Sequence, residues 1–233
     1  MLSRALLAPR SIAIVGASAD PSKVAARPLQ YLRQAGYAGT IYPINARRDE
    51  VLGERAWPSL EALPDAPDHA FILAGVDGVI EAVRACGARG VKVATILATG
   101  FAEAGAEGLQ RVDALKEIVA ETGIRILGPS SIGVVNFHAK ALLTANAAFA
   151  EPNLPSGGVF VASHSGSMLG ALVSRGKARS VGFAGLVSVG NEIDLTLGEI
   201  CAMTLDDPAV TGYMLFLESL RHADDLRRFA VAA

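Results

Sequence analysis

The sequence predicts an α/β protein with two successive units, each containing a parallel sheet covered by helices. Hydrophobic residues make up 51% of the 233 residues and aromatic residues only 6%. The core must therefore consist mainly of Ala, Val, Leu and Ile, as in parallel sheets that are buried on both faces. Short apolar runs alternate with segments of helical periodicity, which is typical of βαβ units. The alternation stops near residue 138 and restarts near residue 159, and this length allows two domains.

The first unit is predicted to hold five strands, at the apolar runs 11–15, 41–44, 70–74, 91–97 and 124–127. Helical spacing separates these runs. One predicted helix ends near Gly36, the second carries a stripe over 79–86 with Asp77 as its N-cap, and the third runs over 109–119 and closes at Gly123. Five strands that alternate with helices predict a doubly wound parallel sheet.

Residues 138–158 lose this periodicity and are rich in Pro, Asn, Ser and Gly, so we expect a linker there. The predicted units are therefore residues 1–140 and residues 156–233. In the second unit we expect strands at 159–162, 183–189 and 212–217, and helices at 168–177, 195–205 and 222–233. Three strands are few for an independent domain, so this unit is predicted to be incomplete.

Charge and cysteine content exclude several classes of protein. A net charge of −2 and a pI near 6.1 provide no basic field for nucleic acid or for anionic membranes. Cys86 and Cys201 each lie in an apolar helical pattern without metal-ligand spacing, so we expect buried thiols and no metal site. No segment resembles a signal peptide or an apolar run of ~18 residues. We expect a cytoplasmic protein.

The turn after the first predicted strand is the first candidate binding site. It runs from Gly16 through Ala17, Ser18 and Pro21 to Lys23, and it has one glycine where a dinucleotide fingerprint has three. Backbone N–H groups at a helix start could bind a phosphate there, although an ordinary βα turn explains the residues equally well. Asn45 and Arg47 follow the second strand, where an acid would bind unphosphorylated ribose hydroxyls. Lys23, Arg27, Arg47 and Arg48 would suit a phosphorylated ribose, as in coenzyme A (CoA) and NADP; the alternative for each is a solvated surface charge.

The strings SIAIVGASADPSKV, RPLQYLRQAGYAGTIYPINARRDEVLG, ATGFAEAGAEG and RILGPSSIG occur in that order within residues 3–136. This part resembles the CoA-binding domain of the nucleoside-diphosphate-forming acyl-CoA synthetases, which is Rossmann-like. The resemblance implies that the turn at Gly16 binds the CoA phosphates, that the loop of Thr99, Gly100 and Phe101 lines the pantetheine channel, and that Gly128, Pro129 and Ser130 lie near the thiol. Ser130 and Ser131 replace the Asn and Cys of the family, which leaves the placement of the thiol open.

The stretch GGVFVASHSGSMLGAL resembles the strand, Ser-Gln-Ser-Gly loop and helix of the flavodoxin-like, succinyl-CoA-synthetase-type domain of the same family. The resemblance implies that Ser163, His164, Ser165 and Gly166 bind the transferred phosphate. His164 stands in the place of the glutamine, and we expect it to donate a hydrogen bond to phosphate rather than to carry a phosphoryl group. Glu218 matches the catalytic glutamate that orients the phosphohistidine, although an ordinary strand-end residue that reaches water explains it nearly as well.

The resemblance implies the CoA-binding portion of an ATP-dependent, ADP-forming acyl-CoA synthetase. Such an enzyme converts a small carboxylic acid, CoA and ATP to acyl-CoA, ADP and phosphate through an acyl phosphate and a phosphohistidine. ATP and Mg²⁺ would bind an ATP-grasp domain or beta subunit outside these residues, so we expect this chain alone to be inactive; an oligomer is compatible with the sequence. The alternatives are a stand-alone CoA-binding module without catalysis and, with less support, an NADP-dependent oxidoreductase.

Overall fold

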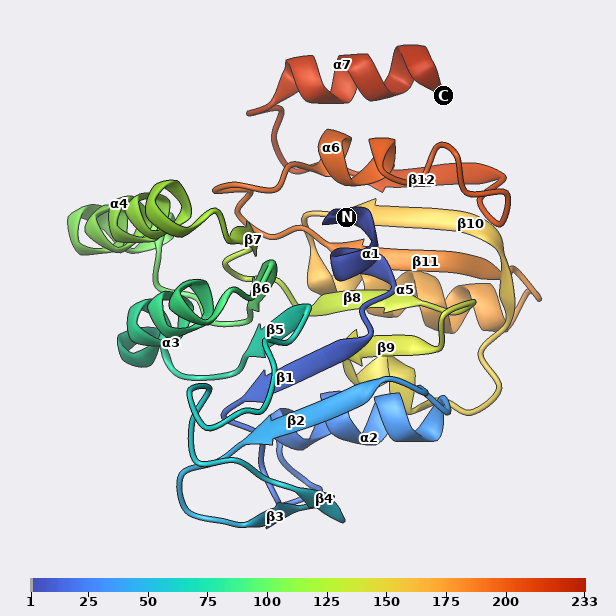
Figure 1. Cartoon of the computed structure of the whole chain (residues 1–233). Coiled ribbons are helices and arrows are strands. Elements are labelled where there is room, and N and C mark those ends of the chain that lie inside the picture. The colour runs from blue at the N-terminus through green and yellow to red at the C-terminus, as the bar shows by residue number, and fades with distance from the viewer. Residues whose placement is uncertain (1) are drawn as a thin grey trace.

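The computed structural model describes residues 2–233, which form two five-stranded sheets and a small hairpin (Figure 1). All strands of the first sheet are parallel. They lie in the order β2 (Thr40–Ile44), β1 (Ser11–Val15), β5 (His69–Ile72), β6 (Val93–Ile96) and β7 (Arg125–Leu127). The five predicted strands are therefore confirmed, with ends that differ by at most two residues. The hairpin of β3 (Glu50–Val51) and β4 (Glu54–Arg55) follows β2 and was not predicted.

Helices connect the parallel strands: α2 (Arg27–Gln34), α3 (Val76–Arg89) and α4 (Gly105–Thr122). A short 3-10 helix, Val24–Ala26, precedes α2. Gly123 ends α4 in the left-handed conformation, as predicted. The prediction of Asp77 as the N-cap of α3 is wrong, because Gly75 is the N-cap and Asp77 lies in the first turn. An acid in the first turn still interacts favourably with the helix dipole.

The second sheet has the order β12 (Gly212–Phe216), β10 (Ser156–Ser163), β11 (Phe183–Ser188), β8 (Gly133–Asn136) and β9 (Ala141–Thr144). Strands β10, β11 and β12 are parallel, whereas β8 is antiparallel to both β11 and β9. The linker prediction is wrong for residues 141–144, which form a strand. A tight connection explains why periodicity was lost, because residues 137–140 turn the chain and Lys140 has a φ of 55°.

Three helices accompany the second sheet: α5 (Gly166–Lys177), α6 (Leu197–Ala202) and α7 (Ala223–Ala232). The predicted helix 195–205 is shorter in the structure. It begins at Leu197, because the Thr196 side chain accepts the N–H of Glu199 and caps α6, and it ends at Ala202. Helix α7 packs on α6 at the end of the molecule opposite β3 and β4 (Figure 1).

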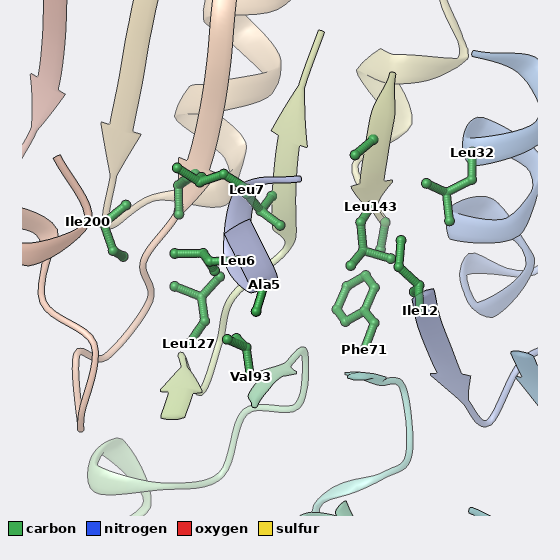
Figure 2. Packing of buried hydrophobic residues seen from close by; sticks show 14 of the residues in the cluster. Ala5, Leu6, Leu7, Ile12, Leu32, Phe71, Val93, Leu127, Leu143 and Ile200 are labelled. Carbon is green, nitrogen blue, oxygen red and sulfur yellow. The ribbon is translucent and has the colours of Figure 1, made fainter. Parts of the chain in front are cut away.

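One hydrophobic core joins the two sheets, and helix α1 (Leu2–Leu7), which was not predicted, is part of it. Leu6 is fully buried and lies among Val93 and Leu127 of the first sheet and Ile200 of α6 (Figure 2). Leu143 of β9 belongs to the same cluster and faces residues of β1 and β5. The two sheets are therefore packed on each other rather than joined by a free tether. Along residues 2–233, no helix combines the length and the apolar character needed to cross a bilayer.

Candidate functional site

The parallel strands of the first sheet bring their following loops to one edge, because their carboxyl ends point the same way. A cavity of about 580 Å³ lies at the ends of β1 and β2. It is lined by Gly16, Ala17, Ser18, Ala19, Asp20, Lys23, Ala25, Asn45, Arg47 and Arg48. The structure thus brings together most residues predicted for the CoA phosphates. Three cations and one carboxylate give this cavity a positive charge.

Internal hydrogen bonds fix the turn after β1. Gly16 has a φ of 84° and its N–H donates to Ile44 O, while Ser18 N–H donates to Ala25 O. The Asp20 carboxylate accepts from both the N–H and the hydroxyl of Ser22, and these bonds lower the pKa of Asp20. Most N–H groups of the turn are thus already used. Within the described residues, only the N–H groups of Ala17 and Ala19 in the turn 16–23 lack an acceptor.

Asn45 ties the second loop to the first. Its side-chain Nδ2–H donates to Ala17 O at 3.0 Å, and its Oδ1 accepts the N–H of Arg47 at 2.9 Å. Asn45 therefore positions the backbone of both loops, including the backbone N–H of Arg47. Arg27 is not brought into the cavity, because its guanidinium donates to Ala145 O at 2.9 Å, and Pro21 is not among the lining residues.

The loop after β6 is closed by an acid that sequence reasoning missed. Glu103 accepts the N–H of Gly100 at 2.7 Å, and its second carboxylate oxygen accepts the Asn191 side chain at 3.0 Å. Burial alone would raise the pKa of Glu103, but the backbone N–H groups and Asn191 outweigh it and lower the pKa. Phe101 is fully buried in the core, whereas Thr99 is exposed. That this loop lines the pantetheine channel stays a prediction.

The loop of Gly128, Pro129 and Ser130 lies between this loop and the second sheet. Ser130 N–H donates to Ala98 O, and Pro129 O accepts the N–H of Asn191 at 2.9 Å. A Cβ on Gly190 would lie 2.1 Å from Pro129 O, so only glycine permits this approach. The predicted thiol-end loop therefore contacts the loop that follows β11.

A second site lies at the carboxyl ends of β10, β11 and β12, where a cavity of about 260 Å³ is lined by His164, Gly190, Asn191, Glu192, Glu218, Ser219 and Arg221. Of the two glutamates, Glu218 is exposed, whereas Glu192 is buried. The cavity contains the predicted Glu218 and His164. It also contains Glu192 of the loop after β11, which sequence reasoning missed.

Both ring nitrogens of His164 contact other groups of the protein. Its Nδ1 accepts the backbone N–H of Glu218 at 3.0 Å, and its Nε2 lies 2.9 Å from Glu192 Oε2. The Nε2–H bond is poorly aligned with this oxygen, so the contact is electrostatic rather than an ideal hydrogen bond. Nδ1 of His164 is therefore used inside the protein, whereas Nε2 is buried beside Glu192 without an aligned hydrogen bond. The donation of a hydrogen bond from His164 to phosphate stays a prediction.

The start of α5 has backbone N–H groups that no intrahelical acceptor binds. Ser165 is the N-cap, and its hydroxyl accepts the N–H of Met168, while Ser163 Oγ accepts the N–H of Ser165. The N–H groups of Gly166 and Ser167 lie in the first helical turn and have no partner within the helix. The hydroxyl of Ser188 is buried without a hydrogen-bond partner among residues 2–233 and lies 3.5 Å from the position of a Cβ on Gly166. The free N–H groups at this helix start are the donors that the predicted phosphate would meet.

Comparisons with known proteins place these features in a family. The "CoA binding domain" family model matches residues 10–136, and the "Succinyl-CoA ligase like flavodoxin domain" model matches residues 156–233. An ADP-forming acetate–CoA ligase of Methanocaldococcus jannaschii is 35% identical over 213 residues, which cover 91% of this chain and 29% of the relative. The alpha subunit of ADP-forming acetate–CoA ligase II of Pyrococcus furiosus is 33% identical over 225 residues, which cover 97% of this chain and 47% of the relative.

A solved structure shows the same fold over nearly the whole chain. The dinucleotide-forming acetyl-coenzyme A synthetase 1 of Ca. Korarchaeum cryptofilum, in complex with phosphate and ADP, has a TM-score of 0.90 and 31% identity. The superposition covers 99% of this chain and 50% of the chain of that synthetase. This chain therefore spans half or less of the lengths of these proteins. The chain belongs to the nucleoside-diphosphate-forming acyl-CoA synthetase family, of which it carries the CoA-binding domain and a succinyl-CoA-ligase-like flavodoxin domain.

Proposed function

We propose that this chain is the CoA-binding portion of an ATP-dependent, ADP-forming acyl-CoA synthetase that acts on a small carboxylic acid. The observation that carries the proposal is the positively charged cavity at the ends of β1 and β2, in a chain that belongs to this family. The relatives that match are named as acetate–CoA ligases, which supports a carboxylic acid substrate without naming which acid this chain uses.

The residues of the cavity suit the phosphate-bearing end of CoA. Lys23, Arg47 and Arg48 supply exposed cations, and the N–H groups of Ala17 and Ala19 supply backbone donors. The loops at Gly100 and Pro129 lie along the same edge of the sheet and would border the rest of the cofactor. CoA, when bound, supplies the thiol that becomes acylated; the chain's own residues bind and orient it.

Within the same proposal, Ser163, Ser165 and Gly166 hold phosphate at the start of α5, and Glu218 orients a phosphohistidine supplied from outside these residues. The exposure of Glu218 at the mouth of the cavity supports this role, because a group that meets a mobile partner must be accessible. ATP and Mg²⁺ would bind an ATP-grasp domain or beta subunit, so residues 2–233 bind substrates without completing the reaction. The oligomeric state and the cytoplasmic location stay predictions.

Calorimetry with CoA, dephospho-CoA and NADPH tests the proposal on the chain itself. CoA is expected to bind, and dephospho-CoA is expected to bind about ten- to a hundredfold more weakly, because it lacks the phosphate that the cations contact. Tighter binding of NADPH than of CoA would overturn the proposal in favour of an oxidoreductase. If CoA binds but addition of an ATP-grasp partner subunit from a related enzyme, acetate and ATP gives no acyl-CoA, the stand-alone CoA-binding module is the better description.

A further inference from the structure

Glu192 is held in a strained position that no local sequence preference explains. Its φ is 48°, which is the left-handed region where a non-glycine residue costs about 1–2 kcal/mol. Its side chain is only 5% exposed. A buried carboxylate in a strained backbone persists only when its surroundings require it, so the contacts of Glu192 indicate what it does.

The two oxygens of Glu192 serve two different donors. Oε1 accepts the N–H of Leu197 at 2.6 Å, at the start of α6, and Oε2 lies 2.9 Å from His164 Nε2. Burial by itself would raise the pKa of Glu192, but His164 and the Leu197 N–H outweigh burial and lower it. His222, which precedes α7, lies with its Nε2 3.1 Å from Glu192 O. Glu192 is thus fixed from three elements and remains a carboxylate.

The other face of His164 determines its protonation. A backbone N–H can only donate, so Nδ1 of His164 must accept the Glu218 N–H with a lone pair. The neutral ring then carries its proton on Nε2, the nitrogen that lies 2.9 Å from Glu192 Oε2. A hydrogen bond also holds the backbone of His164 in place, because its N–H donates to Phe216 O at the end of β12.

From this geometry we propose that Glu192 and His164 form a positioning pair that fixes the backbone at Glu218. Glu192 selects the Nε2–H form of His164, and the bare Nδ1 holds the Glu218 N–H. His164 is therefore not a phosphoryl carrier, since Nδ1 is engaged and Nε2 is buried beside Glu192. The importance of Glu218 rests on the proposed function above, but the pair is a property of this chain's own residues.

The variants His164→Gln and His164→Leu distinguish the effect of the hydrogen bonds of His164 from the effect of its side-chain volume. A glutamine can accept the Glu218 N–H through its amide oxygen and direct its NH₂ group toward Glu192, whereas a leucine can do neither. At position 192, glutamine has one acceptor oxygen where glutamate has two, so Glu192→Gln loses either Leu197 or His164 as a partner. The variants therefore differ in hydrogen bonding while keeping similar volumes.

The test is NMR on the full chain with ¹⁵N-labelled histidine, together with amide hydrogen exchange at Glu218. Wild type is expected to show His164 protonated at Nε2 and bare at Nδ1 near pH 7.5, and Glu192→Gln is expected to lose this single form. The Glu218 amide is expected to exchange about tenfold faster in His164→Leu and within about twofold of wild type in His164→Gln. Exchange at Ile72 in the first sheet serves as the reference for general unfolding.

A wild-type His164 protonated at Nδ1 would overturn the proposal, and this measurement requires no variant to fold. Unchanged exchange at Glu218 in His164→Leu would also overturn it. Neither measurement requires CoA. Loss of CoA binding with the expected His164 spectrum would therefore refute the proposed function alone, while normal CoA binding with the wrong tautomer would refute the positioning pair alone.

Discussion

Arg47 and Arg48 lie beside each other on the loop after β2, and the fixed backbone at Asn45 directs them to one wall of the cavity. Arg47→Gln is expected to weaken binding of CoA by about tenfold and binding of dephospho-CoA by much less, because a charge-assisted contact to the extra phosphate is lost. Calorimetry of both ligands measures the difference. Arg175→Gln on the exposed part of α5 removes the same charge elsewhere and should change neither affinity. Equal losses for both ligands in Arg47→Gln would contradict this assignment.

His69 is buried within the first sheet, where its Nε2 lies 2.7 Å from Thr95 Oγ1. Burial, partly opposed by the backbone of α1, lowers the pKa of His69 from 6.5 to about 4. The unfolded chain therefore binds a proton more readily than the folded chain between these two values. The free energy of unfolding should fall by up to about 3 kcal/mol as pH decreases from about 6.5 to 4 on account of this group.

Urea unfolding across this pH range, in wild type and in His69→Gln, isolates the contribution of His69 from that of the carboxylates. The variant is expected to lose less stability on acidification than wild type. His138→Gln, at an exposed histidine, provides the matched control and should follow wild type. Parallel pH profiles for wild type and His69→Gln would show that the protonation of His69 does not affect stability.

Helix α1 is the element whose importance is least visible in the sequence. Six residues are too short to show a helical period, yet Leu6 is fully buried where the two sheets meet (Figure 2). Leu6→Ala is expected to lower the free energy of unfolding by about 2–5 kcal/mol, because it removes a buried side chain and leaves a cavity. Leu220→Ala, at a side chain that is 63% exposed, should cost less than about 0.5 kcal/mol. Similar small losses in both variants would mean that α1 is not needed for the core.

The parallel strands of both sheets could be predicted because each is a short apolar run between helical patterns. The hairpin β8–β9 could not be predicted, because its strands have only four residues each and no helical pattern separates them. At the site, the strand ends that carry Gly16, Arg47, His164 and Glu218 were visible in the sequence. The residues that contact these loops could not be predicted. Glu103 contacts Asn191, which is 88 positions away in the sequence, and Glu192 contacts His164, which is 28 positions away, and no sequence pattern links either pair.

The whole molecule is expected to unfold in one step, since one hydrophobic cluster includes residues of both sheets. A network of ion pairs adds to this: Arg125 of β7 donates to Asp194 at 3.0 Å and to Glu199 at 2.9 Å, and both acids belong to the second half. The surrounding carboxylates raise the pKa of Arg125 although burial would lower it. The first half therefore cannot lose its structure without exposing apolar surface of the second.

Trp57 is the single tryptophan and lies in the first half, so its fluorescence reports on that half, while circular dichroism at 222 nm reports on the helices of both. The two urea transitions are expected to have the same midpoint. Phe137→Leu, at a half-buried position between β8 and β9, should move both midpoints together. Separate midpoints in wild type would mean that the halves fold independently despite their shared core.

The pairing of β8 with β11 limits how this protein can be dissected or recombined. The CoA-binding family match ends at residue 136, which is the last residue of β8, yet β8 completes the sheet of the other half. A fragment cut at that point would take β8 away from the second sheet and separate β9 from its neighbour, leaving the edge of β11 open to pair with other chains. A chimaera that exchanges the CoA-binding half between relatives should therefore place its junction before β8, so that β8 and β9 stay with the second sheet. It should also match the residues that face Leu143 and Leu6 to the new partner.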